Sequence, residues 1–219
     1  YLFEFRSAVS DCFDIADTEG FEPAVYLYPA SALHVTVATF HAFTQPPPSS
    51  SSSLGTVSED VLAEQWTSVF RAATALPEWP TLPWQLSMER AQIGTRAGIL
   101  LWKETTGGMD AMRQCLRTAA QQLEPQLTAA GVSLDTLSIP DIVHSTFLRF
   151  YRVPTTPGTV VQERFQQQVV PLVKEMFPVP YPVPAAKLVC ERRPYMHIPD
   201  DEHPVLATSS FFLVLDNNE

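Results

Sequence analysis

The sequence has few cysteines, few basic residues and no long apolar runs, and each shortage argues against a class of protein. Three cysteines occur in 219 residues, Cys12, Cys115 and Cys190, and none forms a Cys-x-x-Cys pair. An odd number of widely spaced cysteines favours reduced, buried thiols over a disulfide framework. We therefore expect a cytoplasmic protein, or one from another reducing intracellular compartment.

Apolar runs are short throughout. None approaches the roughly 20 residues that a membrane-spanning helix needs. The first residues, from Tyr1 to Arg6, also lack the basic region and long apolar stretch of a secretory signal. The sequence therefore predicts no membrane partner.

Basic residues are outnumbered, with 14 Lys and Arg against 24 Asp and Glu, so the formal net charge is −10. This charge argues against a broad electrostatic grip on long duplex nucleic acid. It leaves room for a small nucleotide or an RNA end in a pocket, where a few local donors determine binding. A Gly-x-Ser-x-Gly nucleophile elbow and a Gly-Lys-Ser/Thr phosphate loop are both missing from the sequence.

One short pattern occurs twice. His34-Val35-Thr36-Val37 leads to Phe40, and His144-Ser145-Thr146-Phe147 leads to Phe150. Aligned on the histidine, both copies read apolar, His, x, Thr, apolar, two residues, Phe. Because side chains alternate faces along a strand, His and Thr two residues apart point the same way. We predict a strand at each copy, over residues 33–40 and 143–150.

Paired copies of this kind suit phosphoryl chemistry. A histidine with a pKa near 6.5 can give or take a proton at neutral pH. One imidazole would act as general base and the other as general acid, while Thr36 and Thr146 donate hydrogen bonds to phosphoryl oxygens. This scheme requires no metal and no cofactor. The near-symmetry of the copies leaves open which of His34 and His144 is the acid.

The order of predicted elements also repeats. Each motif strand is followed by a proline-containing loop, a helix and two strands, with helices expected over 58–76, about 109–130 and about 159–177 and a final strand over 210–216. An exposed Pro/Ser loop is expected over 44–57. We predict an α+β fold over residues 1–219, a single pseudo-symmetric bilobal domain whose lobes are built around the two motif strands and enclose a central cleft.

These two motifs resemble the paired His-x-Thr/Ser-apolar signature of the two-histidine phosphoesterase superfamily, the LigT-like and cyclic nucleotide phosphodiesterase group. The resemblance extends through the element order from about residue 24 to 216. It implies two antiparallel sheets that enclose the cleft, with helices outside. It also implies metal-independent hydrolysis of 2′,3′-cyclic phosphates or of 2′,5′-linked nucleotides. We favour a 2′,3′-cyclic phosphate on a nucleotide or RNA end, and we expect the protein to be monomeric.

Four further residues are candidates for substrate binding. Phe40 and Phe150 each follow their histidine by six residues and would share its strand face. They would stack on a base or ribose, or pack the far end of each strand. Arg149 lies at odd spacing from His144, so a regular strand turns it away from the cleft, which leaves Arg152, or a bulge in the strand, as a way to reach phosphate.

Two other functions fit the same residues. One is a 2′,5′-phosphodiesterase acting on oligoadenylates or RNA ends, which would need a longer cleft. The other is a module that keeps the fold and binds a nucleotide without hydrolysing it. The intact pair of His and Thr residues favours catalysis over the binding module.

Overall fold

The computed structural model describes residues 2–42, 57–81, 84–176, 179–190 and 205–210. The chain divides into two compact units, each assembled from three segments. Unit 1 consists of Tyr1–Thr36, Leu86–Lys103 and Ile142–Tyr181. Unit 2 consists of Val37–Gln85, Glu104–Asp141 and Pro182–Glu219. Both units mix helices with strands, and the strands form two antiparallel sheets, which confirms the α+β class.

The larger sheet has five strands. Their order is β1 (Val25–Leu27), β4 (His144–Phe150), β3 (Ala97–Glu104), β2 (Trp84–Ile93) and β5 (Pro180–Val183). Strand β4 runs antiparallel to both β1 and β3. The second motif therefore lies on an interior strand, as expected from its alternation of half-buried and buried residues.

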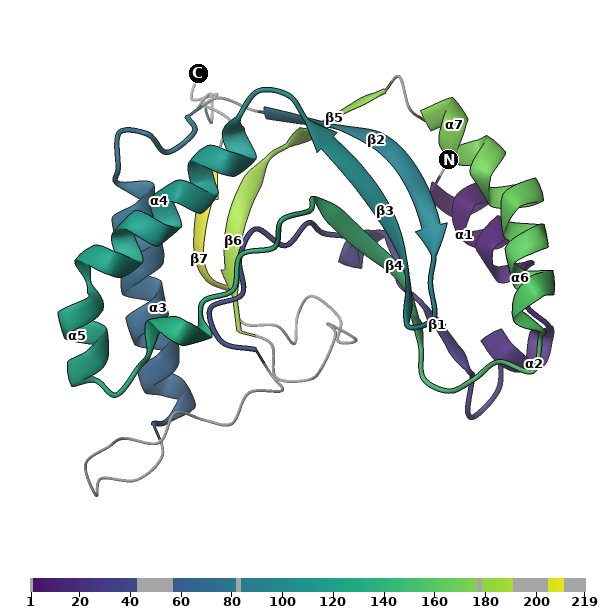
Figure 1. The fold of residues 1–219 in the computed structure, drawn as a ribbon, viewed down its shortest axis with the longest axis horizontal. Helices are drawn as coiled ribbons and strands as arrows, with labels where there is room; N and C mark the ends of the chain where they lie inside the picture. Colours follow the sequence, from purple (N-terminus) through teal and green to yellow (C-terminus); the bar gives the residue numbers. More distant parts are fainter. Residues whose placement is uncertain (1, 43–56, 82–83, 177–178, 191–204, 211–219) are drawn as a thin grey trace, which may run out of the picture. The chain divides into compact units, whose positions relative to one another are not determined.

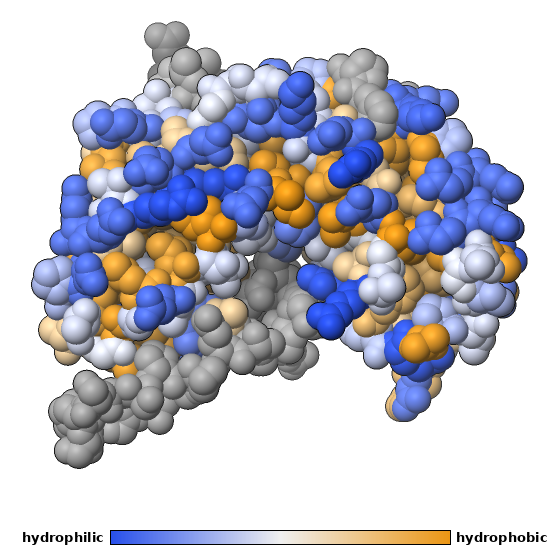
Figure 2. Space-filling model, in the orientation of Figure 1, coloured by the Kyte–Doolittle hydropathy of each residue, from blue (hydrophilic) through white to orange (hydrophobic). Residues whose placement is uncertain are grey.

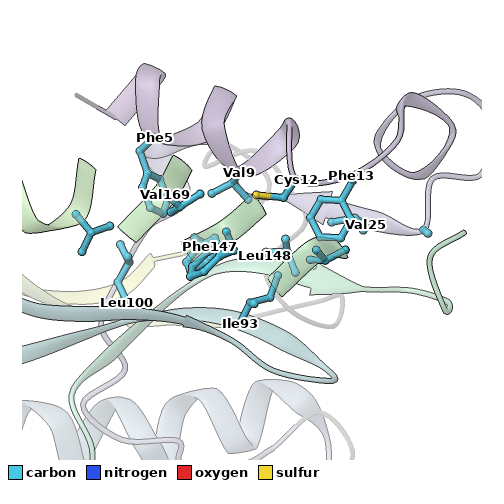
Figure 3. Packing of buried hydrophobic residues seen from close by; sticks show 14 of the residues in the cluster. Phe5, Val9, Cys12, Phe13, Val25, Ile93, Leu100, Phe147, Leu148 and Val169 are labelled. Carbon is cyan, nitrogen blue, oxygen red and sulfur yellow. The ribbon is translucent and has the colours of Figure 1, made fainter. Parts of the chain in front are cut away.

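Helices cover one face of this sheet in unit 1 (Figure 1). They are α1 (Leu2–Ser10), α2 (Ile15–Thr18), α6 (Gly158–Arg164) and α7 (Val170–Met176), the last two joined by a π-helical turn, η3 (Phe165–Val169). The core lies between helices and sheet, and Figure 3 shows side chains of α1, β4 and η3 pointing toward one another. Phe147 lies at its centre, edge-on to Phe5 at 5.1 Å and stacked with Phe165 at 6.2 Å between ring centroids.

Strand β4 contains a β-bulge that alters its alternation. Thr146 lies opposite Ile99, but Leu148 lies opposite Gly98, so β4 carries one residue more than β3 at this point. Phe147 and Leu148 are consequently both buried on the helix-covered side. Beyond the bulge, each residue of β4 points to the face opposite to the one that it would take in a regular strand. Phe150 therefore packs against Phe13 in the core, and Arg149 lies on the same side of the sheet as His144 and Thr146. We call the side of β4 that carries His144, Thr146 and Arg149 the histidine face.

Unit 2 is built around two helices and a hairpin. Helix α3 (Glu59–Thr74) packs against α4 (Gly108–Gln122) and against β7 (Val205–Ser210), which pairs with β6 (Ala185–Val189). The short α5 (Glu124–Ala129) follows α4. Ser58 caps α3 by accepting a hydrogen bond from the Val61 amide at 3.3 Å. Figure 2 shows hydrophilic residues along the outer side of α4, while its inner side buries apolar residues.

The predicted strand over 33–40 is wrong. Pro29 opens a 3-10 turn, η1 (Ala30–Ala32), and the Leu33 amide donates back to the Ala30 carbonyl at 3.2 Å. The edge of β4 is occupied by the preceding segment, β1, and by the Tyr28 amide, which donates to Phe147. Within the described part of 33–40, pairing is limited to an isolated bridge between Thr39 and Ser138. Both His34 and His144 belong to unit 1, whereas the sequence had given each motif a lobe of its own.

The other predicted elements are mostly observed, with changed bounds. The helix expected over 109–130 is divided into α4 and α5 at Leu123, two residues before Pro125. The helices expected over 58–76 and 159–177 correspond to α3 and to the run from α6 to α7. The Pro/Ser loop over 44–57, Val57 apart, and the final strand over 210–216, Ser210 apart, lie outside the described residues.

Asp17 is a fully buried carboxylate that fastens α2 to the loop after β4. It accepts four hydrogen bonds, one each from the amides and hydroxyls of Thr155 and Thr156, at 2.7–3.0 Å. Burial alone would raise the pKa of Asp17, but these hydrogen bonds outweigh it and lower the pKa to about 2. The carboxylate therefore stabilises unit 1 in its ionised form.

We expect Asp17→Asn to lower the free energy of unfolding by about 2–4 kcal/mol, because an amide cannot accept all four hydrogen bonds. The contribution of the carboxylate should be complete above its unfolded pKa and should be lost as the pH falls from about 4 toward about 2. Urea denaturation across this range measures both. Asp14→Asn is the control: Asp14 is a largely exposed carboxylate 3.5 Å from Arg164, so its loss should cost at most about 1 kcal/mol. Equal losses in the two variants would contradict this account.

The close packing at the bulge leads to a second prediction, for a substitution at Gly98. A Cβ atom there would lie 2.5 Å from Cζ and 2.7 Å from Cε2 of Phe147, so Gly98→Ala must displace the central ring of the core. We expect a loss of about 1–3 kcal/mol in the free energy of unfolding. At Gly94 the nearest atom to an added Cβ is the Ala97 carbonyl oxygen at 3.6 Å, an ordinary contact. Gly94→Ala should therefore change stability by less than about 1 kcal/mol, and a larger loss there than at Gly98 would refute the steric argument.

Candidate active site

His144 opens β4 and is half-buried. Its Nδ1 atom is inaccessible to solvent and has no hydrogen-bond partner among the described residues. The imidazolium form carries a proton on both nitrogens, so a buried Nδ1 without an acceptor disfavours that form. The nitrogen that remains for a substrate is Nε2.

His34 lies in the irregular segment that follows η1 and is exposed. Its Nδ1 lies 2.9 Å from the carbonyl oxygen of Ala32, to which it donates. This hydrogen bond fixes the ring and is available both to the imidazolium and to the neutral tautomer protonated on Nδ1. Nε2 is then the nitrogen that can release or accept a proton.

The two histidines are electrostatic neighbours. Burial lowers the pKa of His144, and the positive charges of Arg149 and His34 lower it further. The charge of His34 has this effect although 109 residues stand between the two histidines in the sequence. Both imidazoles that the repeated motif singled out belong to unit 1.

The two threonines are held differently. Ser145 is buried and accepts a hydrogen bond from Trp102 at 3.0 Å, and Phe147 enters the core, so alternation places Thr146 beside His144 on the histidine face. Thr36 is half-buried and follows His34 by two residues. Because residues 33–36 form no strand, alternation does not set the direction of Thr36.

Arg149 reaches the histidine face because of the bulge. Its charge acts on His144, and its side chain hydrogen-bonds to Tyr28. Burial raises the pKa of Tyr28 to about 12 despite that hydrogen bond, so the phenol stays neutral at physiological pH. A regular strand would have turned Arg149 away, and the bulge that the sequence left open as an alternative is the arrangement observed.

The other three candidate binding residues have structural contacts. Phe150 lies in the core of unit 1 against Phe13, on the side of the sheet away from His144. Arg152 donates to the Glu22 carbonyl at 3.0 Å and lies 3.9 Å from Asp17. Phe40 belongs to unit 2, where its ring packs on Trp66 with centroids 5.0 Å apart. Of the two readings that the sequence left open for Phe40 and Phe150, these contacts favour packing.

Three tyrosines on the histidine face were not among the candidates. Tyr26 lies opposite Arg149 in the β1–β4 register. Its ring contacts Tyr28 at 5.1 Å and Tyr151 at 6.0 Å between centroids. The sequence signal for two of them is the Tyr-x-Tyr spacing in Val25-Tyr26-Leu27-Tyr28, which puts both rings on one face of a strand.

Across the described ranges, no three His, Cys, Asp or Glu side chains gather in a way that could hold a metal ion. None of the helices in the described part of the chain is long and apolar enough to cross a membrane.

Comparison with protein-family models, with curated proteins and with solved structures found no match to this chain. The likeness to the two-histidine phosphoesterases therefore rests on the two motifs and on the residues assembled around them. Any function must be argued from those residues.

We expect Arg149→Gln to raise the pKa of His144, because it removes a positive charge that disfavours the imidazolium. His34→Ala should act in the same direction for the same reason. An NMR titration of the His144 ring protons measures this without any substrate. Arg152→Gln is the matched control, since Arg152 is absent from the charges that act on His144. An unchanged pKa in both Arg149→Gln and His34→Ala would show that these groups are not neighbours of His144.

Proposed function

We propose that the protein is a phosphodiesterase that hydrolyses a nucleotide phosphodiester by two-histidine acid–base catalysis without a metal ion. The substrate we favour is a 2′,3′-cyclic phosphate on a nucleotide or an RNA end. The observation that carries the proposal is that His34 and His144 belong to one compact unit and that the charge of His34 acts on His144, with Thr146 and Arg149 on the same strand face as His144. Two proton carriers with nearby hydrogen-bond donors suit the hydrolysis of a phosphodiester without a metal ion.

The two histidines differ in ways that support separate roles. His144 is half-buried and its pKa is lowered, so it is neutral at physiological pH, and in the tautomer that carries its proton on Nδ1 it can accept a proton on Nε2. His34 is exposed, and the Ala32 carbonyl accepts from its Nδ1, which is compatible with a ring that is protonated on both nitrogens. We therefore assign His144 as the general base and His34 as the general acid.

The reaction follows from these roles. His144 takes a proton from water as the water oxygen bonds to phosphorus. The bond between phosphorus and one ribose oxygen breaks, and that oxygen receives the proton from Nε2 of His34. Thr146 and Arg149 donate to the non-bridging oxygens, where negative charge grows. At the end His144 holds the proton that His34 has lost, and exchange with solvent restores both rings.

The test is turnover of 2′,3′-cyclic nucleotides in excess chelator. We expect His34→Ala and His144→Ala each to lower kcat by about 10²–10⁴-fold, the usual range for removal of one acid–base group. His41→Ala is the control, because His41 lies outside unit 1 and the proposal gives it no role. Full activity in either His34→Ala or His144→Ala would remove the two-histidine mechanism. Binding of a mononucleotide without hydrolysis would indicate the non-catalytic module instead, and faster cleavage of 2′,5′-linked substrates would indicate the other esterase.

Thr146 allows a sharper comparison. Thr146→Val keeps the shape of the side chain but removes its hydroxyl, and we expect kcat to fall by about 10²–10³-fold, as for loss of one transition-state donor. Thr146→Ser keeps the hydroxyl and should retain most of the activity. Steady-state kinetics of the two variants, with thermal melts to confirm folding, separates a catalytic hydroxyl from a packing methyl. Similar rates in the two variants would exclude the hydroxyl from the reaction.

A further inference from the structure

The histidine face continues past Arg149 as a row of tyrosines. The Tyr28 amide donates to the Phe147 carbonyl, Tyr26 lies opposite Arg149, and the Tyr151 amide donates to the Ala24 carbonyl at 2.8 Å. These contacts order the rings along the sheet as Tyr28, then Tyr26, then Tyr151, with increasing distance from His144. At about 3.3 Å per residue, His144 and Tyr151 are roughly 20 Å apart along the chain direction.

The rings at the far end of this row are accessible. Tyr28 is 5% exposed and hydrogen-bonded to Arg149, so its role is to hold the guanidinium. Tyr26 is half-buried, and Tyr151 is 52% exposed. Tyr26 and Tyr151 lie tilted at 46° to each other, which leaves aromatic surface beside a positively charged side chain. Proteins bind single-stranded nucleic acid with aromatic rings next to cations, because the bases stack on the rings while the phosphates pair with the cations.

We propose that Tyr26 and Tyr151 form a stacking subsite for a nucleobase upstream of the scissile phosphate, so that the substrate is the end of an oligonucleotide rather than a free mononucleotide. This inference rests on the proposed function, since it takes the scissile phosphate to lie at His144. A mononucleotide held there by its phosphate does not reach Tyr151. A chain of two or three nucleotides does.

The experiment compares kcat/KM for a 2′,3′-cyclic mononucleotide with that for a trinucleotide ending in the same cyclic nucleotide. We expect the trinucleotide to be favoured about tenfold or more, the effect of stacking one base. Tyr151→Ala should abolish that advantage and leave the rate on the mononucleotide unchanged, whereas Tyr151→Phe keeps the ring and should keep the advantage. Phe21→Ala is a control for loss of an exposed aromatic ring, since Phe21 is fully exposed and has no place in the row.

The outcomes separate this inference from the proposed function. If the wild-type protein hydrolyses both substrates equally well, the subsite is refuted and the proposed function stands. If it hydrolyses neither, the proposed function fails, and anisotropy of a fluorescent trinucleotide then tests the subsite alone. Binding that weakens about tenfold in Tyr151→Ala would support the subsite. Absent binding, or equal binding by the variant, would overturn it.

Discussion

The single extra residue in β4 between Thr146 and Leu148 determines which side chains of this strand lie on each side of the sheet. On one side it lets Phe147 and Leu148 enter the core together, where Phe147 joins α1 to η3. On the other side it turns Arg149 toward His144. In a regular strand, alternate residues point to opposite faces. Phe147 and Leu148 could then not both enter the core while Arg149 lies on the side of His144. Gly98 makes the arrangement feasible, since any side chain there would collide with Phe147.

The environments of the two histidines are unequal although their motifs look alike. His144 is carried by an interior strand, half-buried and exposed to two positive charges, which lowers its pKa. His34 is carried by an irregular segment, and its ring donates to one backbone carbonyl. Near-identical sequence patterns therefore place the two rings in different surroundings, and the roles that we propose for them rest on that difference. Burial and neighbouring charge, rather than residue type, support this division of roles.

Much of the secondary structure could be predicted from local patterns. The α3 helix has a Ser58 cap and apolar residues at helical spacing, and the second motif alternates as a strand should. The strand predicted at the first motif is wrong although His34-Val35-Thr36-Val37 has the same alternation. Strand β1 already occupies the edge of β4, and Pro29 turns the chain before the motif can pair. Helix α1 and strand β1 were not foreseen, since both are short and take their stability from the core they complete.

The sequence by itself determined which residues to suspect: two histidines and two threonines are visible in the repeated pattern, and two arginines follow its second histidine. It also determined the α+β class, because periodicities of helix and strand are local properties of the chain. Only the tertiary structure decided which of these residues meet, since the bulge, the burial of His144 and the row of tyrosines arise from strand register and packing between segments far apart in sequence. Those are long-range contacts, and no local pattern encodes them.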